Sequence, residues 1–402
     1  MNEIDVDTDA FLRDLYDLRK IGAYRSGVSR PTYGPQDMES RRWLMARMEE
    51  LGLEASIDGI GNVYGRGRGS GPRALVGSHI ESQVEAGWLD GALGVVGALA
   101  LARAGLPVDV CAFADEECHF GVGYLGSRSF IGELREDEID AGKSRHDGQP
   151  LRAALEDAGL AGLPRQVIDR DRYRGFFEMH IEQGTRLEKA GDRIGVVTGI
   201  VGIWSWTLVF EGQQDHAGGT SMEERRDAGV AAVRLLAAID EEFPKVRGAD
   251  TVWTTGRIVL EPGAPTIIPG RAEVWMHFRD VSLEVMQRLE TRLRELVEES
   301  NRRGPCTVAL KKTLNDIPAV SDPRMMAALS AAAERHAPGK WRKMPSGGGH
   351  DAKVLARKLP MAMLFVPSIG GISHHWTENT SDDDLALGVR VFAEGVGRFL
   401  SA

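Results

Sequence analysis

Short apolar runs along the chain are each followed at once by ionisable residues. Apolar segments such as 89–103 lie between these runs and predict helices that are buried on more than one face. Strands that alternate with helices predict an α/β fold in which a mixed, mostly parallel sheet is flanked by helices. Functional groups gather beyond the carboxyl ends of such strands, so the runs indicate one shared site. The runs at 74–76, 108–114, 176–177 and 361–366 lead into Ser78-His79, Asp115-Glu116-Glu117, Glu178-Met179-His180 and Ser373-His374-His375.

A strand-rich region interrupts this pattern from about residue 206 to 318. The segments 204–210, 252–260 and 272–278 contain β-branched and aromatic residues that favour strands. The ionisable cluster around His374 follows this region, so the chain returns to the first domain. We therefore expect a catalytic domain of residues 1–205 and 319–402 and an inserted α+β domain of residues 206–318. A helix over 283–299 is expected to pack on the small sheet through Leu283, Met286, Leu289, Leu293, Leu296 and Val297.

Composition narrows the class of protein. The 402 residues have a formal net charge of −10, which argues against nucleic-acid binding through general positive charge. The acidic N-terminus lacks a basic segment followed by an apolar one, and no stretch reaches the ~20 apolar residues that span a bilayer. We therefore expect a cytoplasmic protein without a membrane partner. The three cysteines form no C-x-x-C pair, so a bound metal would need His and carboxylate ligands.

One glycine motif suggests a different chemistry but lacks its context. Residues 121–126 match G-x-G-x-x-G, the pattern of dinucleotide-binding folds. The motif does not open directly from a strand, and no acidic residue follows at the ribose-binding distance of about 20 residues. We therefore do not assign a dinucleotide site.

Histidines and carboxylates at the predicted strand ends favour a metal centre. Asp90 alone reads as a helix cap, and each histidine alone is more often a structural residue. The three adjacent carboxylates at 115–117 repel one another unless a positive charge lies nearby. Three histidines, a bridging aspartate and a glutamate together suit two divalent ions.

Ten motifs, in order along residues 40–390, resemble one enzyme family. They resemble the N-carbamoyl-L-amino-acid hydrolases, allantoate amidohydrolases and β-ureidopropionases, which belong to the dinuclear-zinc aminoacylase/carboxypeptidase superfamily. The blocks H-I-E-Q-G and V-V-T-G-I separate this branch from the peptidases. The motifs are G-S-H (77–79), L-D-G-A-L-G-V (89–95), D-E-E (115–117), L-G-S-R (125–128), M-H-I-E-Q-G (179–184), I-G-V-V-T-G-I (194–200), H-A-G (216–218), R-R-D-A (225–228), G-H-D-A (349–352) and G-I-S-H (371–374).

The resemblance implies a two-metal hydrolase with a lid domain that also forms a homodimer. It implies two divalent ions per subunit, with zinc as the expected metal and manganese, cobalt or nickel as alternatives. Glu116 would be the general base that takes a proton from the attacking water. His79 and His180 would hold one ion, Glu117 and His374 the other, and Asp90 would bridge them.

The resemblance also implies residues that contact the substrate. His216 would stabilise the oxyanion, reaching the site of the partner subunit, and Arg279 would clamp the substrate carboxylate. Gln183 would contact the polar head of the substrate. The chain departs from the family pattern at Thr266, where an asparagine binds substrate, and at Glu81, where an aspartate orients a metal-binding imidazole. Asp215 and His277 replace an asparagine and an aspartate.

These observations predict a metal-dependent amidohydrolase. Its substrate would be a small molecule, an N-carbamoyl or ureido derivative of a carboxylic or amino acid. One alternative is an aminoacylase or dipeptidase that uses the same two metals on N-acyl amino acids. A catalytically silent binding protein is disfavoured, because all five ligand positions and Glu116 are present.

Overall fold

The computed structural model describes residues 4–69 and 71–402. The chain divides into two compact units. Unit 1 comprises the chain up to Gly199 together with Val320–Ala402, and unit 2 comprises Ile200–Ala319. The predicted insertion, 206–318, lies within unit 2.

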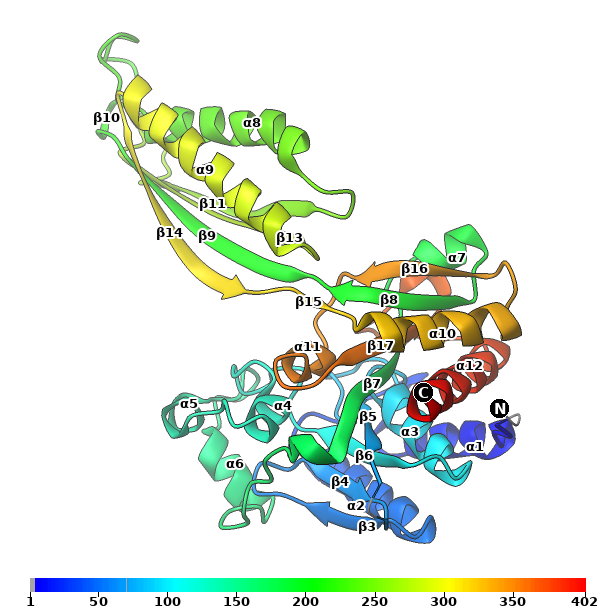
Figure 1. The fold of residues 1–402 in the computed structure, drawn as a ribbon. Coiled ribbons are helices and arrows are strands. Elements are labelled where there is room, and N and C mark those ends of the chain that lie inside the picture. Colours follow the sequence, from blue (N-terminus) through cyan, green and yellow to red (C-terminus); the bar gives the residue numbers. More distant parts are fainter. Residues whose placement is uncertain (1–3, 70) are drawn as a thin grey trace. The chain divides into compact units, whose positions relative to one another are not determined.

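A mixed sheet of nine strands forms the centre of unit 1 in the described residues (Figure 1). The four central strands, in the order β17-β7-β5-β6, pair in parallel, whereas β8, β4 and β3 add antiparallel pairs on either side. The predicted α/β class is therefore confirmed, with parallel pairing at the centre of the sheet. The strands are β3 (Glu54–Ile57), β4 (Val63–Arg66), β5 (Arg73–His79), β6 (Val108–Phe113), β7 (Tyr173–Ile181), β8 (Ile194–Ile200), β15 (Ala319–Val320), β16 (Trp341–Ser346) and β17 (Met361–Val366).

Helices flank this sheet and build its core. Helix α3 packs on β5 and β6, and its residues 92–101 are all buried, as its apolar sequence predicts. Helices α10 and α12 lie side by side and pack on β17 (Figure 1). The helices of unit 1 are α1 (Thr8–Lys20), α2 (Pro35–Glu50), α3 (Ala92–Arg103), α4 (Leu125–Phe130), α5 (Glu136–Ala141), α6 (Leu151–Asp157), α7 (Arg186–Ala190), α10 (Pro323–His336), α11 (Asp351–Leu355) and α12 (Asp382–Ser401), and a short ribbon joins β1 (Ala23–Tyr24) to β2 (Gly27–Val28).

Strand β7 is longer than the apolar run that predicts it. The run ends at Phe177, but the strand continues to Ile181 and includes Glu178 and His180. Both side chains are buried and are tolerated because they have polar partners. Glu178, for example, accepts hydrogen bonds from Ser78 Oγ at 2.6 Å and from Ala352 N at 2.9 Å.

Unit 2 is an antiparallel sheet in the order β11-β13-β9-β14, with α8 and α9 on one face (Figure 1). Alternate residues of β9 and β13 are buried against these helices, which is the pattern of a sheet covered on one side. The elements are β9 (Gly202–Glu211), β10 (Asp215–His216), α8 (Ala228–Val246), β11 (Val252–Glu261), β12 (Ile267–Ile268), β13 (Arg271–Asp280), α9 (Leu283–Arg303) and β14 (Thr307–Asp316).

The prediction that Leu283 belongs to the packing face of α9 is wrong. Leu283 is 42% exposed, and Val285 takes its place among the buried residues of α9. Leu283 is the first residue of the helix, where the chain has not yet turned onto the sheet. None of the helices in the described residues has the length and hydrophobicity needed to cross a membrane.

Candidate metal centre

The parallel strands of unit 1 deliver the predicted ligands to one edge of the sheet. His79 is the last residue of β5, and His180 is the next-to-last residue of β7. Glu116 and Glu117 follow β6, and His374 follows β17 after a short 3-10 turn at Ile369–Gly371. Because neighbouring parallel strands end on the same side, side chains up to 295 positions apart in the sequence converge.

Asp90 lies at the middle of this group. Its Oδ1 atom is 3.1 Å from His180 Nε2 and 3.6 Å from His79 Nε2. Its Oδ2 atom is 3.1 Å from His374 Nε2, which in turn lies 3.7 Å from Glu117 Oε2. The two carboxylate oxygens of Asp90 thus face two different sets of side chains.

Two imidazoles of the centre have a defined proton position. His79 Nδ1 donates to the Glu81 carbonyl oxygen at 3.2 Å, and His180 Nδ1 donates to the Ile181 carbonyl oxygen at 2.9 Å. Both Nε2 atoms lie on the side of Asp90. When protonated, Nε2 donates to the Asp90 carboxylate, and when the imidazole is neutral, the Nε2 lone pair can bind a cation.

Asp90 is not a helix cap. Gly91 occupies the N-cap position of α3, and no side chain caps this helix. Gly91 has a φ of 66°, and a Cβ atom there would lie 2.4 Å from the ring of His79. The backbone of Asp90 is held instead by Glu378, whose Oε1 accepts from Leu89 N at 3.2 Å and Asp90 N at 3.1 Å. These contacts orient the carboxylate towards the histidines.

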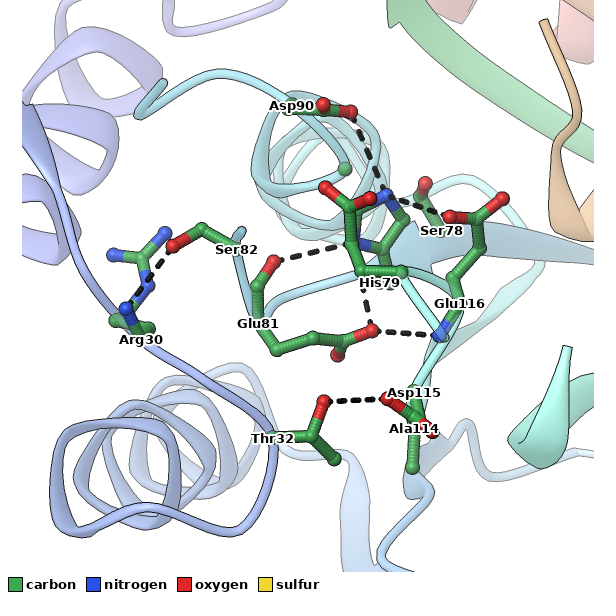
Figure 2. Close-up of polar contacts among 12 residues, drawn as sticks. Arg30, Thr32, Ser78, His79, Glu81, Ser82, Asp90, Ala114, Asp115 and Glu116 are labelled. Carbon is green, nitrogen blue, oxygen red and sulfur yellow. Dashed lines mark hydrogen bonds and ion pairs between the residues drawn. The ribbon is translucent and has the colours of Figure 1, made fainter. Parts of the chain in front are cut away.

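The two glutamates that follow β6 have different surroundings. Glu117 accepts a hydrogen bond from Gln83 Nε2 at 2.8 Å through Oε2, while its buried Oε1 has no hydrogen-bond partner among the described residues. Glu116 Oε2 lies 4.0 Å from His79 Nε2 (Figure 2). Burial raises the pKa of Glu116 well above its ordinary value; His79 opposes this rise and Glu117 adds to it.

The hydrogen bonds of Asp90 polarise the centre. Burial alone would raise the pKa of Asp90, but hydrogen bonds with His180, His374 and His79 hold it well below its usual value. The hydrogen bond to Asp90 raises the pKa of His374 to about 9. A buried carboxylate that stays ionised attracts a cation to this point.

Three groups of side chains in the described residues have their ligand atoms within 4.8 Å of one another. The group Glu178-His180-His350 already has other partners. Both oxygens of Glu178 accept hydrogen bonds, and His350 Nε2 contacts Ser346 Oγ at 2.8 Å. The other two groups share Asp90, and the Oε1 atom of Glu117 in one of them has no hydrogen-bond partner among the described residues, so together they fit two cations. The groups are His79-Asp90-His180, Asp90-Glu117-His374 and Glu178-His180-His350.

Two further predicted residues contact this centre. Gln183 Nε2 donates to Asp90 Oδ2 at 3.1 Å and to Ser373 Oγ at 3.0 Å. The carboxylate of Glu81 lies 3.7 Å from His79 Nδ1, so the contact to that imidazole is made by the backbone of Glu81. The Glu81 carboxylate contacts the backbone of Glu116 (Figure 2).

The remaining residues that were predicted to contact substrate belong to unit 2 and lie at two separate positions. His216 and Thr266 are adjacent, because Ala217 N donates to the Thr266 carbonyl at 3.0 Å and β10 pairs with β12. Arg279 lies near the far end of β13, which starts just after β12. A strand rises about 3.3 Å per residue, so Arg279 lies roughly 25 Å along β13 from Arg271. Unit 2 does not bring Arg279 to His216.

The side chain of His216 is held by a local turn. Its Nδ1 accepts hydrogen bonds from Gly218 N at 3.1 Å and Gly219 N at 2.9 Å. The proton of the neutral imidazole is therefore on Nε2, which leaves a donor on an exposed side chain.

Several residues of the centre were not found from the sequence. Glu378, which holds the backbone of Asp90, comes from a turn with no periodic pattern. Arg41 and Asp37, which contact Glu81 and each other, lie on α2, where charged residues normally read as solvent-exposed. What distinguishes these charged residues is that they are buried, and burial cannot be read from a single sequence.

The α/β fold and these two carboxylate–imidazole groups are those of a two-unit protein with a candidate centre for two cations. A family model for peptidase family M20/M25/M40 matches residues 72–397. The chain therefore belongs to this family.

Named relatives fit the resemblance carried by the motifs. The solved structure of an amidase of the hydantoinase/carbamoylase family from Burkholderia phymatum is 43% identical, with a TM-score of 0.93, and covers 100% of this chain and 99% of that one. A ureidoglycolate hydrolase of Oryza sativa subsp. japonica is 34% identical over 98% of this chain and 85% of its own length. An N-carbamoyl-L-amino acid amidohydrolase of Geobacillus stearothermophilus is 33% identical, covering 94% and 95%. The family and the enzyme class, an amidohydrolase, are confirmed.

Proposed function

We propose that the chain hydrolyses a linear C–N bond of an N-carbamoyl or ureido derivative of a small carboxylic acid. The observation that carries the proposal is the position of Asp90, whose two oxygens face two separate ligand sets. The ureido class of the substrate is supported by what the relatives are named for.

In this proposal His79 and His180 hold one divalent cation and Glu117 and His374 hold the other, with Asp90 shared. Two such ions, when bound, supply Lewis acidity that makes water a nucleophile at neutral pH. Imidazole and carboxylate ligands suit zinc best, and manganese, cobalt and nickel also accept them.

Glu116 acts as the general base. Its carboxylate lies at the edge of the ligand set, 4.0 Å from His79, and is not itself a member of either group. It takes a proton from the water that adds to the ureido carbonyl carbon, and it returns that proton to the nitrogen as the C–N bond breaks. Hydrolysis releases the amino acid and a carbamic acid, which decomposes to ammonia and carbon dioxide.

Unit 2 supplies the substrate contacts. The Nε2–H of His216 stabilises the oxyanion, and the guanidinium of Arg279 binds the substrate carboxylate. Because roughly 25 Å of strand separates Arg279 from the end of β13 near His216, one copy of unit 2 cannot apply both to one small substrate. This separation supports a homodimer in which each site receives His216 from the partner subunit. Thr266, beside His216, would face the same substrate.

The aminoacylase or dipeptidase alternative is favoured by Thr266. A threonine hydroxyl donates and accepts hydrogen bonds through a single oxygen atom. The asparagine of the resembled family has an amide whose nitrogen donates and whose oxygen accepts. A substrate with an acyl group in place of the carbamoyl group needs fewer such contacts.

The test is ammonia and amine release by the purified protein loaded with zinc or manganese. The panel contains N-carbamoyl amino acids, allantoate, ureidoglycolate, ureidopropionate and N-acetyl amino acids. Metal-dependent ammonia release is the expected result. Amine release from N-acetyl substrates alone would establish the alternative instead.

The role of Glu116 is tested in the same assay. Glu116→Gln should keep both metal ions but lower kcat by roughly 10²-fold or more. Glu133→Gln, a surface glutamate paired with Arg357, is the matched control and should leave kcat unchanged. Full activity of the Glu116 variant would remove the assignment.

A further inference from the structure

The loop that carries Glu116 has a strained backbone. Asp115 and Cys118, on either side of the two glutamates, both have a φ of 56°, in the left-handed region. Residues other than glycine rarely adopt this conformation, so surrounding contacts must hold the loop. The position of the Glu116 carboxylate depends on those contacts.

Side chains outside the loop hold each of its acidic residues. Asp115 accepts a hydrogen bond from Thr32 Oγ1 at 2.9 Å, and Glu117 is held through its carbonyl and carboxylate by Gln83 Nε2. Glu116 donates its backbone N–H to Oε1 of Glu81 at 2.8 Å (Figure 2). Glu81 therefore contacts the proposed general base directly through the main chain.

Glu81 is itself fixed by a buried arginine. Arg41 Nη2 lies 3.1 Å from Glu81 Oε2, and both side chains are completely buried. The other nitrogens of this guanidinium donate to Asp37 Oδ2 at 3.0 Å and to the Gly61 carbonyl at 2.6 Å. The fork of Arg41 thus has three fixed acceptors and cannot move without breaking several buried contacts.

The length of Glu81 directs its carboxylate to Glu116 and not to the imidazole. The Oε1 atom is 3.7 Å from His79 Nδ1, which is too far for a hydrogen bond, whereas the Glu81 carbonyl accepts from that nitrogen at 3.2 Å. An aspartate would be shorter by one bond of about 1.5 Å and could not reach both Arg41 and Glu116 N.

We propose that Glu81 and Arg41 are positioning residues for Glu116: the buried pair sets the backbone position of the general base. The inference rests on the proposed function only for the role of Glu116. In this proposal the Glu81 side chain does not orient the imidazole of His79, because the backbone carbonyl of residue 81 already does so.

The first test is Glu81→Asp in the metal-loaded protein. We expect kcat to fall about 10- to 100-fold, as for a displacement of about 1 Å, with unchanged KM and unchanged bound metal. In a Glu116→Gln background the same change should lower kcat no further, because both act through one group. Unchanged kcat, or equal losses in both backgrounds, would overturn the proposal. So would a loss of bound metal that accounts for the loss of activity.

The second test needs no substrate. Residue-resolved hydrogen exchange should show the amide of Glu116 exchanging at least about tenfold faster in Glu81→Asp and Arg41→Lys than in the wild type. An unchanged exchange rate would refute the coupling. If the wild type hydrolyses none of the ureido substrates, the proposed function fails, but this exchange measurement still decides the inference.

A matched variant controls for the general cost of breaking a buried ion pair. Arg73, at the start of β5, pairs with the buried Asp109 at 2.6 Å, six residues and about 20 Å along the strand from His79. Arg73→Met should lower the melting temperature without changing kcat or the exchange of Glu116. Arg41→Lys should lower kcat even at temperatures where it is fully folded. Equal effects of the two variants on kcat would mean that Arg41 is only structural.

Discussion

The candidate metal centre of unit 1 and the proposed substrate residues of unit 2 are built in opposite ways. Asp90, His79 and His180 are buried and stand on or beside strands of one sheet, each with a second contact that fixes its orientation. His216 and Thr266 are exposed and lie on short loop-like segments. All the proposed metal ligands therefore lie within unit 1, whereas the proposed substrate residues His216 and Thr266 lie in unit 2. The predictions below test this contrast.

The largest effect is expected at Asp90. Asp90→Asn should remove both metal ions, because its two oxygens face both ligand sets, and His374→Ala should remove one. The activity loss for Asp90→Asn should exceed the about 10- to 100-fold cost of losing an outer-layer partner of a metal ligand. Metal content measured by mass spectrometry checks this. Retention of one ion by Asp90→Asn would contradict a bridging role.

A smaller loss of activity is expected at His216. His216→Ala should lower kcat by about 10²- to 10³-fold, as for loss of an oxyanion donor, and leave the bound metal unchanged. Steady-state kinetics and metal analysis provide the measurement. Loss of metal in this variant would mean that the histidine supports the centre and not the substrate.

Mixed dimers sharpen the same contrast. Arg279→Ala should raise KM for acidic substrates about tenfold or more, with little effect on neutral amides. When His216→Ala and Arg279→Ala subunits are unfolded, mixed and refolded together, half of the dimers are mixed, and one of the two sites in each mixed dimer has both residues. The assay uses an acidic substrate well below its KM, where each variant alone has at most about a tenth of wild-type activity. About one quarter of wild-type activity should therefore return. No recovery, despite mixed dimers seen by mass spectrometry, would place both residues in one subunit's site.

The smallest effect concerns stability. Burial, with the charge of Glu178, raises the pKa of Asp351 from 3.8 to about 8. The folded chain keeps this proton while the unfolded chain loses it, so the free energy of unfolding falls as pH rises from about 4 to 8. Asp351→Asn removes this contribution. In chelator-treated protein its melting temperature should exceed that of the wild type by a few degrees at pH 8.5 and by less at pH 5. An equal difference at both pH values would contradict the raised pKa.

Much of the centre was predictable because it follows strand ends. The apolar runs before His79, Glu116 and His374 mark β5, β6 and β17, and parallel strands must end together. Strand β7 was harder, since Glu178 and His180 lie inside it and interrupt the apolar pattern. Their burial depends on partners that are distant in the sequence, such as Ser78 and Ala352.

By itself the sequence determined the fold class, the family and the set of ionisable residues, because hydrophobic periodicity and short motifs are local properties of the chain. Only the tertiary structure decided which oxygen of Asp90 faces which histidine, and that the Glu81 carboxylate holds Glu116 while its carbonyl holds His79. It also decided that Arg41 is buried beside them. These contacts are made or lost when an interatomic distance changes by a few tenths of an ångström. Only the packed sheet and its loops fix distances that closely between segments far apart in the chain.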